Sequence, residues 1–397
     1  MNQRFLTVDD SAARPASIRR NAMAGLRCMG CTRRYPLQDM PTGCPECAGR
    51  GTPASLEVVY GALPKTLQPA SSGYRWGAWL PYTQGISLAE GNTPCMDLPR
   101  LARELGVRQL SAKVEAMNPT GSHKDRMSAQ GINRALDVGA RTVVLASSGN
   151  AAVSAAVYCA VAGLRCEVAT YRQMPEPYVR ALSRFGAKRV LFDRSRDRWE
   201  HVRRQVESEG AFALTNYHVP AIGSSVFCVE AYRAVALECA ADACLPDHII
   251  VPTARGDLLW GLHSGLRDLL AAGLIPHMPK LWAVEPFPRL SRVLAGAPLQ
   301  SEFEGLTAQS SIAGSTVTLQ QELAVRQSGG GAVVVNDAEA AKGVSQLAAQ
   351  GLWVELCAGA GVGALASLRR QGDIAPSDHA LLLLTARGDR DSFHVAQ

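Results

Sequence analysis

Short apolar runs alternate with segments of helical periodicity along most of the chain. Strands are predicted where aliphatic residues form runs bounded by turn residues: 141–146, 164–170, 189–192, 248–252, 280–285, 331–335 and 379–385. Helices are predicted where apolar positions recur every three or four residues: 98–105, 127–138, 151–162, 177–185, 197–209, 226–240, 258–272, 337–350 and 361–371. Such alternation is typical of an α/β protein in which helices cover open parallel sheets.

The first part of the chain lacks this alternation and instead carries two cysteine pairs. Cys28 and Cys31 form one Cys-x-x-Cys pair, Cys44 and Cys47 form the other, and twelve residues separate the pairs. Two such pairs can present four thiolates in a closed tetrahedron, the arrangement of a structural zinc site. We therefore predict a small N-terminal zinc ribbon. A degenerate ribbon that folds without metal is the alternative reading.

These patterns divide the chain into three parts. We expect a leader and ribbon in residues 1–60, a large α/β domain from 61–115 and 215–397, and a smaller α/β domain from 116–214. The leader holds several arginines, but acidic residues interrupt them and no apolar signal segment follows. No internal repeat or low-complexity segment is found.

Composition narrows the class of protein. A chain of 397 residues with 47% hydrophobic and 19% charged residues is typical of a globular enzyme. The net charge of +6 is modest and no basic run occurs, which argues against a nucleic-acid partner. No apolar run reaches 18 residues, which argues against a membrane span. The 11 cysteines are odd in number and mostly scattered, which favours a reducing, cytoplasmic location.

Two segments carry most of the candidate chemistry. Residues 118–126 read Asn-Pro-Thr-Gly-Ser-His-Lys-Asp-Arg and set Lys124 where a helix is expected to begin. Residues 143–150 read Val-Val-Leu-Ala-Ser-Ser-Gly-Asn, a buried strand that leads into a helix of small residues. An isolated lysine is usually a surface residue, and Ser148 or Asn150 could simply cap that helix. A capped helix N-terminus also makes an anion site, so the two readings are compatible.

Both segments resemble motifs of the threonine synthase family, approximately NPTGSFKDR and SSGNTA, and the resemblance extends over most of the chain. The family belongs to the tryptophan synthase β superfamily. The resemblance implies the fold called pyridoxal phosphate (PLP) type II, in which the cofactor lies between two open parallel-sheet domains. It also implies that Lys124 forms a Schiff base with the cofactor aldehyde and moves protons during catalysis.

The resemblance assigns further residues to the cofactor and substrate. Asn150 is expected beside the ring hydroxyl of PLP, and Thr385, after the last strand, beside the pyridine nitrogen. A neutral hydroxyl there would leave that nitrogen unprotonated and favour elimination and replacement; a strand-end hydroxyl of no special role is the alternative. Substrate binding is expected from Ser147, Ser148 and Gly149, and from Thr93 in the loop 90–94, which resembles a Glu-Gly-x-Thr-Pro loop of the family. An ordinary turn before the 98–105 helix is the alternative for that loop.

The loop expected to hold the cofactor phosphate departs from the family. Where relatives have a glycine-rich loop, this chain reads Pro-Thr-Ala-Arg-Gly-Asp at 252–257, so that only Gly256 remains. Asp257 adds a negative charge where an anion should bind, unless it caps the following helix. We assign Thr253, Arg255, Gly256 and His123 to this subsite, with His123 and Arg255 replacing lost amide contacts.

A second departure concerns the substrate. Residues 216–223 read Asn-Tyr-His-Val-Pro-Ala-Ile-Gly and lack the arginine that holds the homoserine phosphate in the family; His218 or Arg172 could substitute for it.

We expect a PLP-dependent lyase that converts O-phosphohomoserine and water to threonine and phosphate. The alternatives are β-replacement or β-elimination on a serine- or cysteine-type amino acid in a specialised biosynthetic pathway, and a non-catalytic protein on an old enzyme scaffold. A homodimer is implied by the resemblance alone.

Overall fold

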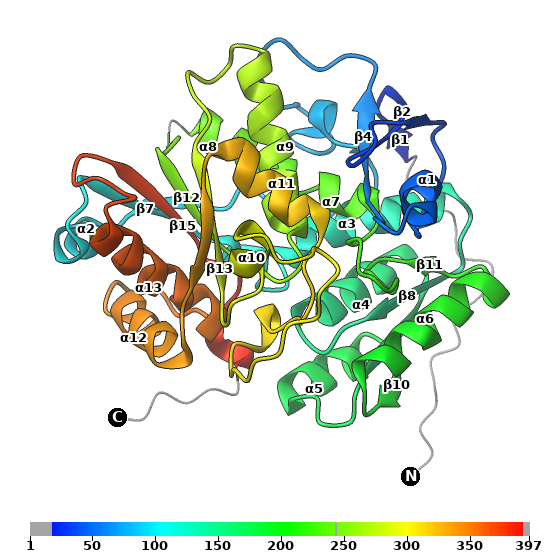
Figure 1. Ribbon diagram of the computed structural model, residues 1–397. Coiled ribbons are helices and arrows are strands. Elements are labelled where there is room, and N and C mark those ends of the chain that lie inside the picture. Colours follow the sequence, from blue (N-terminus) through cyan, green and yellow to red (C-terminus); the bar gives the residue numbers. More distant parts are fainter. Residues whose placement is uncertain (1–17, 243, 392–397) are drawn as a thin grey trace.

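Two helix-covered sheets and a small antiparallel sheet form the molecule in the computed structural model, which describes residues 18–242 and 244–391 (Figure 1). The first 17 residues, which hold much of the expected leader, lie outside the described residues. The α/β fold class with parallel-sheet domains is confirmed.

The larger sheet has six strands in the order β14-β13-β12-β15-β7-β6, all parallel except β6. Its strands are β6 (Cys95–Asp97), β7 (Gln109–Lys113), β12 (His248–Pro252), β13 (Lys280–Glu285), β14 (Gly331–Val334) and β15 (His379–Leu383). The helices that follow or cover them are α2 (Pro99–Leu105), α7 (Val226–Glu230), α8 (Arg233–Ala241), α9 (Asp257–Ala271), α10 (Leu290–Leu294), α11 (Leu319–Ser328), α12 (Asp337–Ala348) and α13 (Leu356–Gln371).

Both faces of this sheet are buried. In β12, Ile249 and Val251 pack in the core that includes α8 and α9, whereas Ile250 packs in a separate core with α12 and α13. Leu381 and Leu382 of β15 divide between the two cores in the same way. Strands covered on both faces read as continuous apolar runs, which is why these two were recognisable in the sequence.

The second sheet has four parallel strands in the order β10-β9-β8-β11. They are β8 (Thr142–Ala146), β9 (Arg165–Tyr171), β10 (Lys188–Phe192) and β11 (Phe212–Ala213), with helices α3 (Lys124–Asp137), α4 (Asn150–Ala162), α5 (Glu176–Arg184) and α6 (Ser195–Glu209). Its strands lie between residues 142 and 213, inside the range expected for the smaller domain. The exact domain limits stay a prediction.

The N-terminal ribbon packs against α7 (Figure 1). It consists of β2 (Met23–Cys28), β3 (Arg34–Tyr35), β4 (Leu56–Tyr60) and the short helix α1 (Pro45–Gly49), while β1 (Arg19–Arg20) pairs with β5 (Tyr82–Gln84). Phe227 of α7 is fully buried among the ribbon's apolar residues. Asp39 of the ribbon also accepts a hydrogen bond from Arg134 of α3 at 3.0 Å. The ribbon is therefore an integral part of the packed structure.

Some predicted elements were wrong in detail. The expected helix 226–240 is broken between α7 and α8, where Tyr232 is fully buried and Gly261 of α9 lies against Val229 and Tyr232. Helix α13 begins at Leu356, five residues earlier than predicted. Strands β6, β7 and β11 and helix α11 were not predicted, because their short or mixed sequences carry little periodicity.

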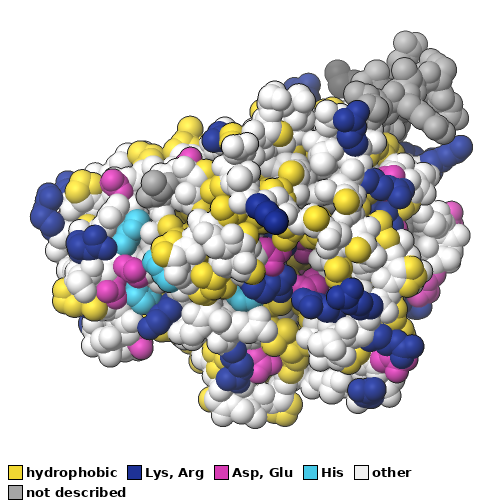
Figure 2. Space-filling model, turned by 90° about the horizontal axis from the view of Figure 1, so that it is seen from above, with side chains coloured by type: hydrophobic (Ala, Val, Ile, Leu, Met, Phe, Trp, Pro, Cys, Tyr) yellow, Lys and Arg dark blue, Asp and Glu magenta, His cyan; other side chains and the backbone are white. Residues whose placement is uncertain are grey.

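In the face shown in Figure 2, basic side chains are intermingled with acidic and apolar ones. Among the described residues, no helix combines the length and apolar character needed to cross a bilayer.

Candidate active site

The two sheets bring two of the candidate residues, Asn150 and Thr385, to one partner. Asn150 begins α4 after β8, and Thr385 follows β15 of the larger sheet. The amide of Asn150 donates to Oε2 of Glu355 at 3.0 Å, and the hydroxyl of Thr385 donates to Oε1 of the same carboxyl at 3.2 Å. Ligands of open α/β sheets bind beyond the carboxyl ends of strands, and this meeting point lies there.

Lys124 is the first residue of α3, and its loop is fixed to the end of β15. The preceding backbone N–H, that of His123, donates to the carbonyl of Thr385 at 2.9 Å. Nζ of Lys124 lies 3.4 Å from the hydroxyl of Tyr232, which is itself fully buried. Burial lowers the pKa of Lys124, while Asp257 and Glu355 partly oppose the shift. The site thus favours the neutral amine that a nucleophile or base needs.

Lys113 shows the opposite behaviour. Its Nζ is buried 2.8 Å from Oε2 of Glu238 and donates to the carbonyl of Thr93 at 2.6 Å. Burial alone disfavours the charge, but Glu238 raises the pKa of Lys113 above its usual value. Of these two lysines beneath the surface, only Lys124 has the lowered pKa of a reactive amine.

His123 is held by the same strand end. Its Nδ1 lies 3.1 Å from the carbonyl of Thr385, and its ring centroid lies 5.5 Å from that of Tyr232. Burial, and then the neighbouring Lys124, lower its pKa well below the usual range. A neutral ring that donates from Nδ1 has no proton on Nε2. His123 therefore fits the predicted phosphate contact only if it takes up a proton when the anion binds.

The Ser-Ser-Gly-Asn loop leads directly into the N-terminus of α4. Gly149 is the N-cap residue, and no side chain caps the helix. Asn150 is engaged with Glu355, and the Ser147 hydroxyl accepts from the Gly149 N–H at 3.4 Å. The reading of Ser148 or Asn150 as a simple helix cap is therefore wrong. The first N–H groups of α4 are left for an anion, as a substrate carboxylate requires.

Glu355 was missed by the sequence analysis. It is buried at the N-terminus of α13 and also accepts from the Ser311 hydroxyl at 3.2 Å. Burial is the main reason that its pKa is raised to about 7. An acidic residue between Val354 and Leu356, inside an apolar run, was the available signal.

The loop before α9 is shaped by Gly256, whose φ of 80° suits glycine. A Cβ atom at this position would overlap the side chain of Gln321. Asp257 does not cap α9; its carboxyl accepts from the Ser224 hydroxyl at 2.5 Å and from Gln320 at 2.6 Å. The negative charge noted in the sequence is thus directed to other partners.

Thr253 and Arg255, the other residues assigned to this loop, have different surroundings. The buried Thr253 hydroxyl donates to the carbonyl of Val251 at 2.6 Å. The guanidinium of Arg255 reaches toward the smaller sheet, with Cζ 4.9 Å from the Trp199 ring centroid and Nε 3.3 Å from the Thr316 hydroxyl. Their roles toward a cofactor phosphate stay predictions.

Thr93 lies in a buried charge cluster. Its hydroxyl donates to Glu115 at 2.7 Å, and Arg126 donates to both Glu115 and Glu238. The hydroxyl is thus already occupied within the protein, and its contact with substrate stays a prediction.

The four ribbon cysteines converge as predicted. Their sulfur atoms all lie within 4.8 Å of one another; Cys28 and Cys47 are 3.5 Å apart, and Cys31 and Cys44 are 3.6 Å apart. This spacing suits a single tetrahedral metal ion.

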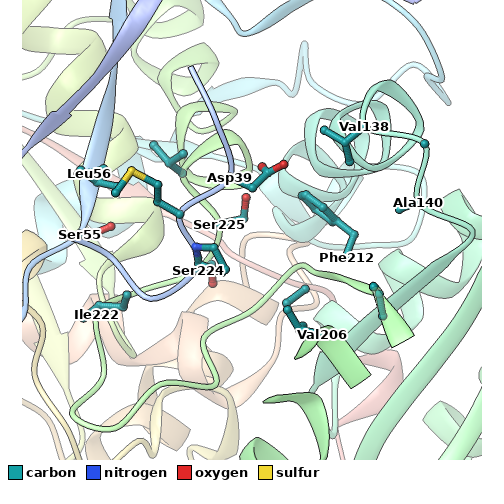
Figure 3. Close-up of a pocket in the computed structure, with 17 residues that line it drawn as sticks. Asp39, Ser55, Leu56, Val138, Ala140, Val206, Phe212, Ile222, Ser224 and Ser225 are labelled. Atoms are coloured by element: carbon teal, nitrogen blue, oxygen red, sulfur yellow. The ribbon is translucent and has the colours of Figure 1, made fainter. Parts of the chain in front are cut away.

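One cavity lies away from this chemistry. It encloses about 240 Å³ between the ribbon, the end of α3 and the smaller sheet, where Leu56, Val138 and Phe212 line it (Figure 3). Asp39 also borders it but is bonded to Arg134. Its walls carry no amine or imidazole, so we place the reaction at Lys124.

The family model described as "Pyridoxal-phosphate dependent enzyme" matches residues 86–386. The chain belongs to this family. It is a PLP-dependent lyase similar to threonine synthases: those of Methanosarcina acetivorans and Methanocaldococcus jannaschii are each 28% identical, over 91% and 92% of this chain and equal shares of their own.

Solved structures confirm the PLP type II fold of the enzyme. A PLP-dependent aspartate racemase superposes with a TM-score of 0.64 at 22% identity, covering 74% of this chain and 90% of its own. An O-ureido-L-serine synthase superposes with a TM-score of 0.61 at 23% identity, covering 76% of this chain and 90% of its own. The serine racemase of maize gives 0.64 at 20% identity, covering 75% and 88%. These neighbours differ in reaction, so they inform the fold alone.

The residues of the enzyme fit its cofactor. Lys124 offers an amine of lowered pKa for the aldehyde, and Asn150 and Thr385 offer neutral polar groups for the ring. Gly256 provides, at the start of α9, a backbone position where a side chain would not fit.

Proposed function

We propose that the enzyme converts O-phosphohomoserine and water into threonine and phosphate. In this reaction the C–O bond at Cγ breaks, a proton is delivered to Cγ, and a hydroxyl group adds at Cβ. The observation that carries the proposal is Lys124, an amine of lowered pKa whose charged neighbour Glu355 also binds Asn150 at the uncapped N-terminus of α4. The match to threonine synthases over nine-tenths of the chain supports this choice of substrate.

The chain's own residues supply binding and proton transfer. Bound PLP supplies an electron-accepting ring that stabilises negative charge at the substrate's Cα. The neutral amine of Lys124 takes the proton from Cα and returns it, and exchanges protons at Cβ. The Tyr232 hydroxyl, whose pKa burial raises well above its usual value, stays protonated and holds that amine at 3.4 Å.

Substrate orientation comes from the other sheet. The loop of Ser147, Ser148 and Gly149 binds the α-carboxylate through its hydroxyls and through the first N–H groups of α4. Glu355 holds the side chains of Asn150 and Thr385 through its two oxygen atoms and would fix them beside the ring of bound PLP. Both contacts restrict the substrate and cofactor to one relative orientation.

One observation keeps a second function in view. The two residues expected to replace the family's phosphate-binding arginine are engaged elsewhere. His218 lies 3.2 Å from the carbonyl of Pro220, and Arg172 is exposed and paired with Asp193. This supports, as the alternative, β-replacement or β-elimination on a serine- or cysteine-type amino acid.

We also propose that Cys28, Cys31, Cys44 and Cys47 hold a structural zinc ion. The sulfur spacing supports four thiolate ligands with no open position. The ion would act on stability rather than on the reaction.

Phosphate release tests the proposed reaction. The purified enzyme, reconstituted with PLP, is incubated with O-phosphohomoserine, O-phosphoserine, serine or cysteine, and threonine, phosphate, pyruvate and sulfide are measured. Threonine and phosphate in equal amounts from O-phosphohomoserine, lost in Lys124→Ala, are expected. Pyruvate or sulfide from the other substrates, with no threonine, would move the enzyme to the alternative.

A further inference from the structure

The cleft between the two sheets holds arginines that the proposed mechanism leaves unused. We propose that Arg198 and Arg255 bind an oxyanion on the side chain of the substrate, and that Arg289 positions the loop of Arg255. The inference rests on the proposed function in one respect, namely that the ligand is an amino-acid substrate with an anionic side chain.

The two cations come from opposite sheets: Arg198 is a residue of α6 beside the smaller sheet, and Arg255 reaches that helix from the larger sheet. Arg255 follows β12 and lies over the ring of Trp199, a residue of α6. Arg198 precedes Trp199 on the same helix, and its Cζ lies 3.7 Å from the centroid of the Tyr171 ring. The Tyr171 hydroxyl accepts from Arg198 at 2.8 Å and the Ser195 hydroxyl at 3.2 Å.

Protein carboxylates compensate this charge only in part, through the nearby Asp257. Within residues 18–242 and 244–391, neither Arg198 nor Arg255 forms an ion pair with an acidic side chain. The nearby Asp257 is held by Ser224 and Gln320, and Glu302 at the rim pairs with Arg196. Arg198 is only 8% exposed, and its Nε has no hydrogen-bond partner. A buried cation in this state is costly unless an anion joins it.

The pKa shifts agree with this description. Burial lowers the pKa of both guanidinium groups; for Arg255, Asp257 partly opposes the shift and Arg198 adds to it. Each cation therefore sits in a site that disfavours its charge until a negative group arrives.

Arg289 has a supporting position behind Arg255. It is 1% exposed and donates to the carbonyl of Thr253 at 3.1 Å and to that of Gly314. A methyl group added to Gly314 would lie 3.5 Å from Nη2 of Arg255 and 3.7 Å from Nη1 of Arg289. Because the Nη atoms of Arg289 are used on backbone carbonyls, it fixes the loops on both sides of Arg255 and leaves ligand binding to its neighbours.

A cavity of about 130 Å³ opens beside Arg255, and Arg198 reaches its edge through its hydrogen bond to Ser195, which lines the cavity. Arg255, Ser195, Ser315 and Thr316 give it cationic and hydroxyl walls, and residues 219–221 close it with apolar side chains. Guanidinium groups pair with phosphates and carboxylates through two parallel hydrogen bonds, and hydroxyls add further donors. Phosphate esters and carboxylates share this chemistry, and the experiment separates them.

Phosphate titration of the holoenzyme tests the site, because the cofactor already fills its own phosphate subsite. Inorganic phosphate binding is measured by calorimetry for the wild type, Arg198→Gln, Arg255→Gln and the control Arg203→Gln. Arg203 lies on the same helix, but it is exposed and paired with Glu200 and Glu207. We expect each test variant to weaken phosphate binding roughly ten- to a hundred-fold, with bound PLP per chain unchanged, and the control to bind as the wild type does.

Three results would overturn the inference. These are no phosphate binding by the wild-type holoenzyme, equal binding by both test variants and the wild type, or loss of PLP from Arg255→Gln, which would assign Arg255 to the cofactor phosphate. If Arg255→Gln does not fold, Arg198→Gln decides the question alone. Circular dichroism establishes folding in each case.

Kinetic measurements with O-phosphohomoserine on the same variants distinguish a failure of this inference from a failure of the proposed function. KM for O-phosphohomoserine should rise by the same factor as the phosphate Kd in Arg198→Gln. If phosphate binding depends on Arg198 but O-phosphohomoserine is not turned over, the oxyanion site stands and the proposed function fails; competition by glutamate would then indicate a carboxylate ligand. If threonine forms but the phosphate Kd and the KM for O-phosphohomoserine are the same in both arginine variants as in the wild type, the proposed function stands and this inference fails.

Discussion

The hydroxyl of Thr385 lies 3.2 Å from Glu355, so a buried acid stands directly behind the group expected at the cofactor's pyridine nitrogen. The same carboxyl accepts from Asn150 at 3.0 Å, on the other side of the site. Two residues assigned to different edges of the ring therefore share one titratable partner. Because burial raises the pKa of Glu355 to about 7, this partner changes charge near neutral pH.

Glu355→Gln should remove a pH-dependent step from the enzyme. The native protein holds the Glu355 proton more tightly than the unfolded chain, so its contribution to stability is full below pH 4.5 and is lost as pH rises toward about 7. The substitution should abolish that loss, a gain of about 3 kcal/mol at pH 8. Urea unfolding at pH 5 and pH 8 measures it.

Glu230→Gln is the matched control. Burial also raises the pKa of Glu230 to about 7, but its carboxyl accepts from Tyr60, beside the ribbon. Both substitutions should flatten the dependence of stability on pH, whereas only Glu355→Gln should change how the visible absorbance of bound PLP depends on pH. Equal absorbance profiles in the two variants would argue against a role for Glu355 at the cofactor.

Gly256→Ala should damage the phosphate loop. Its φ is 80° and a Cβ would overlap Gln321, so the loop must shift to accept a side chain. We expect a loss of more than about 1 kcal/mol in stability and weaker PLP binding, measured by cofactor titration. Gly273→Ala has a similar φ of 68° but nothing within 4 Å, so it should lose some stability while binding PLP normally. Normal PLP affinity in both variants would contradict this account of the loop.

Arg126→Ala should be severely destabilising. Arg126 donates to Glu115 at 2.7 Å and to Glu238 at 2.6 Å, and all three side chains are buried. Without Arg126, the two buried carboxylates have only Lys113 as a cationic partner, which should lower the free energy of unfolding by about 3–5 kcal/mol. The exposed pair Arg100–Glu104 gives the comparison: Arg100→Ala should cost at most about 1 kcal/mol. Chemical unfolding of both variants measures the difference, and similar losses would be inconsistent with the buried cluster.

Cys44→Ser should remove one metal ion per chain and lower stability, because the ribbon then loses the ion that joins its two Cys-x-x-Cys pairs. The ribbon covers the buried Phe227 of α7, so its loosening would reach the main core. Metal content by elemental analysis and thermal unfolding measure the two effects. Cys166→Ser, a buried cysteine outside the cluster, should keep the metal. A wild-type protein without zinc would contradict the proposal.

Sequence pattern predicted the elements that are buried on both faces or carry strong periodicity. The limits of β12 and β13 were predicted to the residue, because their apolar runs end at polar or turn residues. The break between α7 and α8 was not predictable, since it depends on the burial of Tyr232 against α9, a contact between distant segments.

The residues of the candidate site likewise fall into those that local sequence could predict and those that it could not. Lys124 and the Ser-Ser-Gly-Asn loop lie in contiguous motifs and could be recognised from their residue sequence. Glu355 and Tyr232 were missed, because each matters through a partner more than a hundred residues away or from another element. The orientation of Arg255 toward Trp199 likewise follows from how the two sheets pack, and no local pattern encodes it.

The central claim, that Lys124 is the residue bonded to PLP, is tested most directly by borohydride reduction of the holoenzyme followed by peptide mass spectrometry. The account predicts a phosphopyridoxyl group on Lys124, whose pKa is lowered, and none on the buried Lys113, whose pKa is raised. Modification of Lys113 or of a surface lysine with Lys124 unmodified, or no modification after PLP is added, would contradict it.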